Sequence, residues 1–258
     1  MAGALIAGAV SLHAQAQPLD VVYEPTPHET VERMLSVADV RSSDFLIDLG
    51  SGDGRIAIAA GRRGARALGV ELNLDRVREA TAKAEAARLG DRVSFRQQDL
   101  FKTPLANATV IALYLLPELS IRLLPQLLAL RPGTRVVSHR FSMGDWDPDI
   151  TDTTGGTVYL WIVPGNVSGR WSVRHGEQNF DVEFKQHYQT ISGTTLLAGG
   201  ASSPIREARL RGNEIEFSVN IAGRTTRFSG TVSGASARGV SGGLGFGQAA
   251  AGWSATRF

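Results

Sequence analysis

The chain of 258 residues contains no cysteine, few aromatic residues (7%) and a net charge of only +2. Without cysteine it can form neither a disulfide bond nor a thiolate metal site, and it offers no cysteine nucleophile. The nearly balanced charge and the lack of a basic stripe give no electrostatic case for nucleic-acid binding. Its five histidines are scattered along the sequence, so we expect no metal site. Length and composition are those of an ordinary globular protein with two domains.

The sequence also lacks an apolar run long enough to span a bilayer, so we expect no stable membrane span. One shorter run, residues 4–12, is followed by Ala14-Gln15-Ala16, a small-residue pattern typical of a signal-peptide cleavage site. The basic residues that usually precede such a run are missing. Two interpretations of residues 1–17 therefore stand: a signal peptide, which would make the protein periplasmic or secreted, and a flexible tail on a cytoplasmic protein.

The most informative feature that is present is a glycine-rich turn after an apolar strand. The strand Phe45–Leu49 carries Asp48 near its end, and glycine occupies positions 50, 52 and 54. Glycine leaves no Cβ between the backbone and a ligand, and the helix that follows directs its free N–H groups toward the same place. The pattern predicts a nucleotide-binding turn, although its spacing differs from the GxGxxG of dinucleotide-binding domains.

Two further strands are followed by carboxylates. Residues 65–71 are typical of a second strand ending in Glu71, about 20 residues after the turn, where a nucleotide cofactor presents its ribose hydroxyls. Residues 93–98 are typical of a third strand, and the Asp99 carboxylate that follows suits an exocyclic adenine amine. Three successive strand ends thus provide the polar groups that a nucleoside cofactor needs.

This combination resembles the class I S-adenosylmethionine (SAM)-dependent methyltransferases, whose motifs are a D-x-G-x-G-x-G turn and acids after the second and third strands. The flanking segments 23–27, 114–118 and 137–146 narrow the resemblance, over residues 20–164, to the small protein-lysine methyltransferases of archaea and mitochondria. The resemblance implies SAM as the cofactor and a Rossmann-like α/β fold, in which a parallel sheet has an antiparallel edge. Thr26, held between two prolines, is expected in a lid over the cofactor. The residues implied for cofactor binding are Thr26, Asp48, Gly50, Ser51, Gly52, Glu71, Leu72, Asp99 and Leu100.

The same resemblance implies a path for a methyl acceptor. Tyr114 is the implied catalytic residue, because it stands at the end of the fourth strand, where open α/β sheets bind their ligands. An acid is expected at the position of Arg140, and this departure leaves the charge preference of the substrate open. His139 has an alternative role as a partner of backbone groups, and Trp146 as a hydrophobic lid. The residues implied for the substrate channel are Leu115, Leu116, Pro117, His139 and Trp146.

From Gly165 onward the sequence changes to short segments that alternate apolar and polar residues and are separated by glycine. A period of two predicts half-buried antiparallel strands, and Trp171 and Trp253 could meet if the sheet curls into a barrel. We therefore divide the chain into a signal-peptide-like segment (1–17), a methyltransferase domain (18–164) and a barrel-like β domain (165–258). The β domain is either an appendage for stability or oligomerisation, or a platform that binds a partner or a small ligand.

The expected activity is methyl transfer from SAM to an amine nucleophile, with protein lysine as the acceptor that the resemblance implies. Such a displacement needs an unprotonated nucleophile, aligned and held at about 3 Å, but no covalent enzyme intermediate. An apolar channel favours the neutral amine by desolvating the ammonium form, and no residue is required as a general base. Two alternatives stay open: a small-molecule acceptor, and an exported binding protein with a retained methyltransferase scaffold. Export conflicts with enzyme activity, because SAM is made in the cytoplasm.

Overall fold

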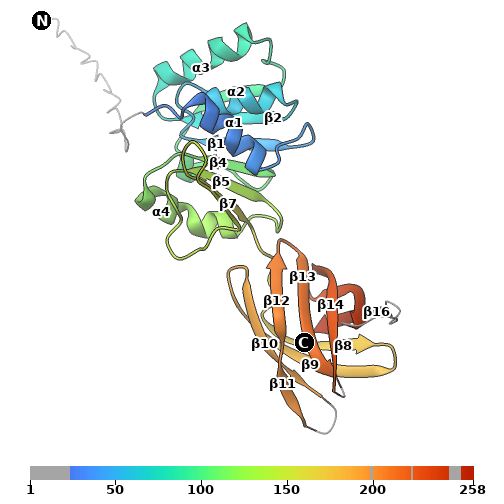
Figure 1. The fold of residues 1–258 in the computed structure, drawn as a ribbon. Coiled ribbons are helices and arrows are strands. Elements are labelled where there is room, and N and C mark those ends of the chain that lie inside the picture. The colour runs from blue at the N-terminus through green and yellow to red at the C-terminus, as the bar shows by residue number, and fades with distance from the viewer. Residues whose placement is uncertain (1–23, 198–199, 222, 244–250) are drawn as a thin grey trace, which may run out of the picture.

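The computed structural model describes residues 24–197, 200–221, 223–243 and 251–258 (Figure 1). The signal peptide predicted for residues 1–17 lies outside the described residues. The N-terminal region, residues 24–164, alternates helices with strands, as the sequence pattern predicts. Its elements are α1 (His28–Val37), β1 (Phe45–Leu49), α2 (Arg55–Arg62), β2 (Arg66–Glu71), α3 (Leu74–Ala86), β3 (Val93–Gln97), the 3-10 helix η1 (Leu100–Lys102), β4 (Val110–Leu113), α4 (Pro117–Leu128), β5 (Arg135–His139), β6 (Ile150–Asp152) and β7 (Val158–Ile162).

The seven strands of the N-terminal region form one sheet in the order β3-β2-β1-β4-β5-β7-β6. The first five run parallel, whereas β7 is antiparallel to both β5 and β6. The predicted parallel sheet with an antiparallel edge is therefore confirmed. The strand order reverses between β1 and β4, and such a switch point is where open α/β sheets bind ligands. β6 is an edge strand that the sequence pattern did not predict, because none of its three residues is buried.

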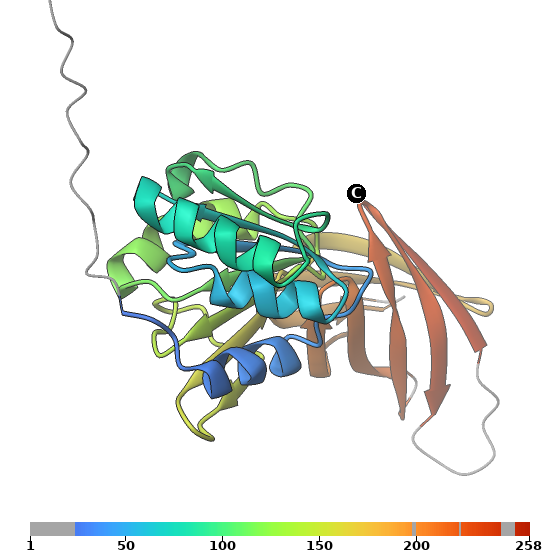
Figure 2. The ribbon, with the colours of Figure 1, turned by 90° about the horizontal axis from the view of Figure 1, so that it is seen from above.

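Helices cover both faces of this sheet (Figures 1 and 2). Side chains from α1, α2 and α3 pack on one face, and side chains from α4 pack on the other. Neighbouring residues of one strand therefore point into different cores: Leu46 packs on the side of α1 and α2, and Ile47 packs on the side of α4. Burial on both faces explains why β4 consists entirely of buried apolar residues.

The C-terminal region, residues 165–258, is a single antiparallel sheet in the order β11-β10-β9-β8-β16-β15-β14-β13-β12. The first strand of this region, β8, pairs with the last, β16, in the middle of that order. Its elements are β8 (Gly169–His175), β9 (Gln178–His187), β10 (Thr190–Leu196), β11 (Ser202–Pro204), β12 (Arg206–Arg211), β13 (Glu214–Ile221), β14 (Arg224–Ser233), β15 (Ser236–Gly243) and β16 (Ala251–Arg257).

This sheet curls until strands near its two edges approach each other, β10 beside β12 and β11 beside β13, which confirms the barrel-like shape. Trp171 on β8 and Trp253 on β16 both point into its core. Inside, the rings of Phe217 and Phe228 stack with centroids 5.1 Å apart, and Trp253 meets both edge-on at 5.8 and 5.7 Å. The cavity that remains measures about 10 Å³, roughly the room that one water molecule requires. Side chains thus fill the interior of this sheet at that point.

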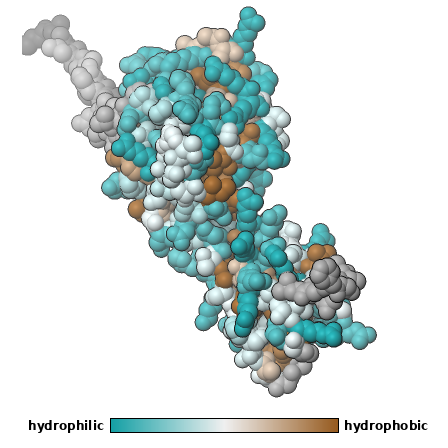
Figure 3. Space-filling view, in the orientation of Figure 1, coloured by the Kyte–Doolittle hydropathy of each residue, from teal (hydrophilic) through white to brown (hydrophobic). Residues whose placement is uncertain are grey.

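A short connection, residues 163–168, joins the two regions, and the boundary predicted between residues 164 and 165 falls within it. The regions also touch, since the indole Nε1 of Trp146 in the N-terminal region donates to Oε1 of Gln189 in the C-terminal region at 2.8 Å. On the face that Figure 3 shows, the surface of both regions is mainly hydrophilic, with small apolar patches. Within the described part of the chain, no helix is long and apolar enough to cross a membrane, and no group of three or more potential metal ligands comes together.

Candidate functional site

The turn after β1 is built by glycines in a conformation that other residues rarely adopt. Gly50, Gly52 and Gly54 have φ angles of +81°, +52° and +82°. The N–H groups of Gly50 and Ser51 both donate to the Val70 carbonyl, at 2.9 and 3.0 Å, which ties the turn to the end of β2. Gly54 is the N-cap of α2, so the turn leads directly into the free N–H groups of that helix. The backbone is therefore exposed to a ligand at the switch point of the sheet.

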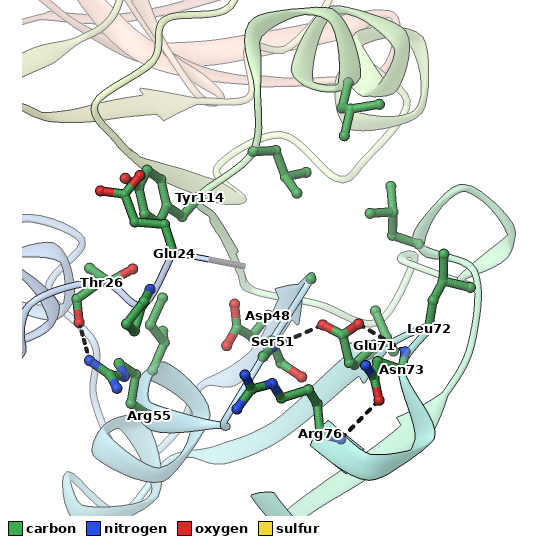
Figure 4. Close-up of a pocket in the computed structure, with 18 of the residues that line it drawn as sticks. Glu24, Thr26, Asp48, Ser51, Arg55, Glu71, Leu72, Asn73, Arg76 and Tyr114 are labelled. Carbon is green, nitrogen blue, oxygen red and sulfur yellow. Dashed lines mark hydrogen bonds between the residues drawn. The ribbon is translucent and has the colours of Figure 1, made fainter. Parts of the chain in front are cut away.

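Glu71, the last residue of β2, joins this turn to the next one. Its Oε2 accepts from the Gly52 N–H at 3.1 Å, and its Oε1 accepts from the Asn73 N–H at 3.0 Å (Figure 4). The Asn73 side chain in turn accepts from the N–H groups of Asp75 and Arg76 and caps α3. The carboxylate of Glu71 is thereby fixed at the rim of the pocket, between two backbone turns.

Two buried polar atoms beside the turn have no hydrogen-bond partner within the described residues. They are Oδ2 of Asp48, a residue only 2% exposed, and Oγ of Ser51, a residue 7% exposed. Burial raises the pKa of Asp48 to about 8, and the negative charges of Glu71 and Asp53 add to this effect. An unpartnered buried polar atom is costly, so atoms of this kind at a cavity wall indicate a site that is completed by a ligand.

The next acid, Asp53, is held by cations instead. Arg55 donates from Nε and Nη2 to the two Asp53 carboxylate oxygens, each at 2.8 Å, and Lys83 donates to Oδ2 at 2.8 Å. Although burial acts to raise the pKa of Asp53, these hydrogen bonds outweigh it and hold that pKa well below its usual range. Arg55 also donates to the Thr26 carbonyl at 2.7 Å, so the N-terminal segment is pinned over the turn. Thr26 is consequently buried, with an exposed fraction of 4%.

These elements enclose a cavity of about 460 Å³, within the range of small-molecule sites. Figure 4 shows Glu71, Leu72 and Asn73 on one side of it and Glu24 and Tyr114 on the other, with Asp48 between them. The cavity is lined by Glu24, Pro25, Thr26, Asp48, Gly50, Ser51, Gly52, Arg55, Ile56, Val70, Glu71, Leu72, Asn73, Arg76, Gln98, Leu100, Tyr114, Leu115 and Leu119. Eight of the nine residues implied for cofactor binding are therefore brought together, and Asp99 is the exception.

Tyr114 lies at the opposite end of the cavity from Glu71. Its hydroxyl accepts from Nη1 of Arg140 at 3.4 Å, and the same guanidinium nitrogen donates to both carboxylate oxygens of Glu24 at 3.4 Å. Behind the phenol ring, the ring centroids of His139 and Phe141 lie at 4.7 and 6.3 Å. This end of the cavity thus combines an aromatic ring with a cation that is more than half exposed.

Five of the predicted residues lie away from the cavity wall. The Asp99 carboxylate accepts from the Phe101 N–H at 2.9 Å and caps η1. His139 is buried, with Nδ1 at 3.0 Å from the Thr157 carbonyl, as its alternative role has it. Trp146 is completely buried and packs against Trp161, because its loop folds inward rather than over the cavity. Leu116 and Pro117 turn the chain into α4 outside the lining.

The cavity also includes residues that the sequence reasoning did not assign to it. Arg55 is the first residue of α2, and Leu119 lies in the first turn of α4. Their positions just after predicted loops were the only sequence features that could have indicated them. Gln98 stands beside Asp99, and Asn73 two positions after Glu71, so their proximity to predicted site residues could have indicated them. Glu24 precedes Thr26 by two positions, so it too could have been indicated by a predicted site residue, although its contact with Arg140 could not.

Comparison with known proteins identifies relatives of this arrangement. The family model of the ANTKMT methyltransferase domain matches residues 48–150. A protein-lysine N-methyltransferase of Saccharolobus islandicus is 40% identical over 151 residues, which cover 55% of this chain and 94% of the archaeal protein. The adenine nucleotide translocase lysine N-methyltransferase of Mus musculus is 36% identical over 153 residues, covering 58% of this chain but only 66% of the mouse protein.

A solved structure is also similar to the N-terminal region. It is the crystal structure of an RNA methyltransferase from Salinibacter ruber in complex with S-adenosyl-L-homocysteine, which is 51% identical to this chain. The match covers 56% of this chain and 96% of that one, with a TM-score of 0.54. Like the matches to the archaeal and mouse proteins, it leaves more than two fifths of this chain unmatched.

Proposed function

Because this chain belongs to the family of SAM-dependent protein-lysine N-methyltransferases, we propose that it transfers the methyl group of SAM to the side-chain amine of a lysine in a protein. The observation that carries the proposal is that Glu71 and Tyr114 line the two ends of one cavity of about 460 Å³. A cofactor bound at the Glu71 end would therefore face an acceptor that arrives at the Tyr114 end. The archaeal and mouse relatives are both named for methylation of protein lysine.

The residues at the polar end fit SAM. The unpartnered oxygens of Asp48 and Ser51 can accept or donate hydrogen bonds, and the glycine turn admits a ligand close to the backbone. In the proposal, the Glu71 carboxylate accepts from the ribose hydroxyls, while Leu72 and Leu100 pack on the adenine ring. Bound SAM supplies an electrophilic methyl group on a positively charged sulfur. The fit rests on the two orphaned polar atoms, which a ligand with several donors and acceptors would satisfy.

The residues at the other end suit a neutral amine. Leu115 and Leu119 are apolar, and Tyr114 presents an aromatic ring, so an ammonium group that enters loses hydration. The charge of Arg140 adds little to this effect, because its guanidinium pairs with the Glu24 carboxylate that lines the same end. Desolvation lowers the pKa of an acceptor lysine, and the neutral amine is the form that attacks.

The acceptor loses its proton to solvent in this scheme, without a dedicated base. We do not assign His139 to that role, because its side chain is buried and lies outside the cavity lining. The contribution of the protein is then mainly positioning, which can supply a large part of the rate of a bimolecular displacement. Tyr114 is the residue that we assign to orienting the acceptor, by its hydroxyl and by its ring.

A second candidate acceptor is RNA, because the relative from Salinibacter ruber is named an RNA methyltransferase. The charge of the N-terminal region argues against it, since residues 24–164 contain 17 Lys and Arg against 18 Asp and Glu. A surface without net positive charge gives little of the phosphate attraction that dominates nucleic-acid affinity. Lysine therefore remains the favoured acceptor, and RNA becomes an outcome of the test.

The test has two stages and uses the full chain. First, calorimetric titration with SAM compares the wild type with Glu71→Ala, and Glu85→Ala on the exposed face of α3 is the matched control. We expect binding in the wild type and in the control, and a loss of affinity on the order of 100-fold in Glu71→Ala, because several charge-assisted hydrogen bonds are lost. Unchanged affinity in Glu71→Ala would contradict the assignment of the ribose site.

Second, SAM carrying a tritiated methyl group is incubated with three probes: mixed histones, the same histones with acetylated lysines, and single-stranded RNA. Label on histones that acetylation abolishes supports the lysine acceptor, and Tyr114→Phe should then lower turnover without changing SAM affinity. Label on RNA alone would replace the lysine acceptor by a nucleic acid. SAM binding without label on any probe would contradict general lysine methylation and leave a small-molecule acceptor.

A further inference from the structure

The loop between β5 and β6, residues 140–149, is held from outside the N-terminal region. Trp146 stands in this loop and is fully buried. Its indole Nε1 donates to Oε1 of Gln189 at 2.8 Å, and its carbonyl accepts from Nε1 of Trp161 at 2.7 Å. Gln189 belongs to the turn between β9 and β10 of the C-terminal region. A residue of one region thus satisfies the only polar side-chain atom of a core tryptophan in the other.

The same β9–β10 turn contacts the residues on both sides of Trp146. Gln189 donates from Nε2 to the Asp147 carbonyl at 2.5 Å, and the Tyr188 hydroxyl donates to Oδ1 of Asp145 at 2.9 Å. The Tyr188 ring also packs on Trp146, with centroids 5.9 Å apart. Two successive turn residues, Tyr188 and Gln189, therefore contact the three successive loop residues 145–147. Tyr188 has a left-handed φ of +51°, so the backbone of the turn is itself constrained.

The other end of the loop contacts the acceptor end of the cavity. Arg140 donates to the Tyr114 hydroxyl, and the Phe141 ring stacks beside the Tyr114 ring. Between the two ends, Met143 and Trp146 form an antiparallel bridge, with the Trp146 N–H donating to the Met143 carbonyl at 3.2 Å. The loop therefore contacts Tyr114 at one end and the C-terminal region at the other, with the Met143–Trp146 bridge between them.

The cofactor end is built independently of that loop. Asp48 and Glu71 lie at the ends of β1 and β2, and the Glu71 carboxylate is held by the glycine turn and by the start of α3. None of the C-terminal residues that the structure describes lines the cavity. A disturbance of the β9–β10 turn would thus reach Tyr114 before it reached the cofactor residues.

We propose that Gln189 is a positioning residue for the acceptor: it fixes the loop 140–149 so that Arg140 and Phe141 hold Tyr114 in place. This inference rests on the proposed function, because that function assigns Tyr114 to the acceptor. It gives the C-terminal region a role in catalysis without any ligand of its own, consistent with its filled interior. Removing Gln189 leaves a buried indole N–H without an acceptor, which the loop can relieve only by moving.

The first measurement is hydrogen–deuterium exchange of the full chain, which needs no acceptor. Gln189→Leu removes both hydrogen bonds at similar volume, and Gln178→Leu, an exposed glutamine at the other end of β9, is the matched control. We expect faster exchange at residues 140–147 in Gln189→Leu only, with residues 48–54 unchanged in both variants. Equal exchange of the loop in wild type and Gln189→Leu would overturn the proposal, whichever acceptor the enzyme uses.

The second measurement is kinetic and uses whichever probe the wild type methylates. Gln189→Leu should lower kcat on the order of 10- to 100-fold, as a misplaced catalytic group does, while the Kd for SAM stays within about twofold. Gln189→Glu retains an acceptor for the Trp146 indole and should restore part of kcat. If Gln189→Leu fails to fold, Tyr188→Phe, which deletes only the bond to Asp145, should show a smaller loss of kcat. Equal loss of SAM affinity and kcat would indicate general destabilisation and contradict a positioning role.

If the wild type binds SAM but methylates no probe, the proposed function fails. The exchange measurement still tests whether Gln189 holds the loop 140–149. A double variant, Gln189→Leu with Tyr114→Phe, tests whether Gln189 affects kcat through Tyr114 or independently of it. If the loop acts through Tyr114, the combined loss of kcat should be smaller than the product of the two single losses. Multiplicative losses would show that Gln189 acts elsewhere and would overturn the proposed route.

Discussion

The two sheets of this protein border cavities of very different size. The parallel sheet of the N-terminal region is buried on both faces, yet its strand ends at the switch point leave buried polar atoms without partners beside a cavity of about 460 Å³. The antiparallel sheet of the C-terminal region encloses packed aromatic rings and leaves about 10 Å³. The first region therefore has unpartnered polar atoms at the wall of a cavity, whereas in the second, where His175 Nδ1 is also unpartnered, aromatic side chains fill the interior.

The largest expected effect is the loss of stability when a ring is removed from the aromatic core of the C-terminal sheet. Phe228 is fully buried and contacts the rings of Phe217, Phe180 and Trp253. Phe228→Ala should lower the free energy of unfolding by about 3–5 kcal/mol, because a large cavity replaces the ring. Denaturant unfolding of the full chain measures this loss. If the two regions differ as described, the affinity for SAM in native buffer should not change.

The control for this variant is Phe258→Ala, since Phe258 is 71% exposed. A change within about 0.5 kcal/mol is expected there. Equal destabilisation by both variants would show that the interior of the C-terminal sheet is not packed as the structure has it. A fall in SAM affinity with Phe228→Ala would show that the core of the second region reaches the cofactor end.

The next prediction compares two glycines, one from each region, that both have a left-handed backbone conformation. Gly54, in the cofactor turn, has φ +82°, and an added Cβ would lie 2.5 Å from Phe95 Cζ and 2.8 Å from Ala80 Cβ. Gly234, in the β14–β15 turn, has φ +60° with nothing within 4 Å. Gly234→Ala should cost about 1–2 kcal/mol for the backbone alone. Gly54→Ala should cost about 1–3 kcal/mol more, because the turn is also overpacked.

Unfolding curves of the two glycine variants, measured side by side, give the difference directly. SAM affinity provides a second readout, because only Gly54→Ala should weaken it by displacing the turn. Identical costs would mean that the surroundings of Gly54 relax freely, and would remove the close packing that fixes the cofactor turn against α3 and β3.

The part of the site that lies at strand ends could be predicted from the sequence. Asp48 and Glu71 lie at the carboxyl ends of two parallel apolar strands, and parallel strands bring these ends to one edge of the sheet. The glycine turn could be predicted for a similar reason, since positive φ restricts the residue type. The fold of the C-terminal region followed from its period of two, because a half-buried antiparallel strand alternates its exposure.

The acceptor end could not be predicted in the same way. The placement of Trp146 depends on Gln189, 43 positions later in the chain, and no local period encodes that contact. Glu24 reaches the cavity through Arg140, 116 positions away. Asp99 follows its strand as predicted, but its carboxylate caps η1 instead of lining the cavity. Local patterns therefore identify most of the cofactor end, whereas at the acceptor end only Tyr114 and Leu115 were predicted correctly and tertiary contacts decide the rest.

A smaller effect tests the unsatisfied site through pH. With a pKa of about 8, Asp48 is mostly protonated at pH 7 in the ligand-free protein, whereas an unfolded Asp is ionised. Folding therefore takes up a proton, so the contribution of this group to stability is largest in acid and falls as the pH rises toward 8. SAM brings positive charge, which favours ionised Asp48, and binding should release a proton.

Affinity for SAM should therefore rise with pH between about 6 and 8, by at most tenfold per unit for one released proton. Calorimetry in buffers with different ionisation enthalpies measures the released proton, and Asp48→Asn should abolish the release. A wild-type affinity that is flat across this range would show that binding releases no proton, and would contradict a SAM-linked ionisation of Asp48.

The smallest effect concerns charges on the outer face of the C-terminal sheet, where we expect almost no change in stability. Glu216 accepts from Arg227 at 2.6 Å, and this hydrogen bond holds the pKa of Glu216 below its usual range. Both side chains are more than a third exposed, so solvent and salt screen their attraction. Glu216→Gln should change the unfolding midpoint by no more than experimental error at neutral pH and about 1 M salt. A clear loss there would mean that the second region, like the first, depends on particular polar groups, and that its stability does not reside in its aromatic core alone.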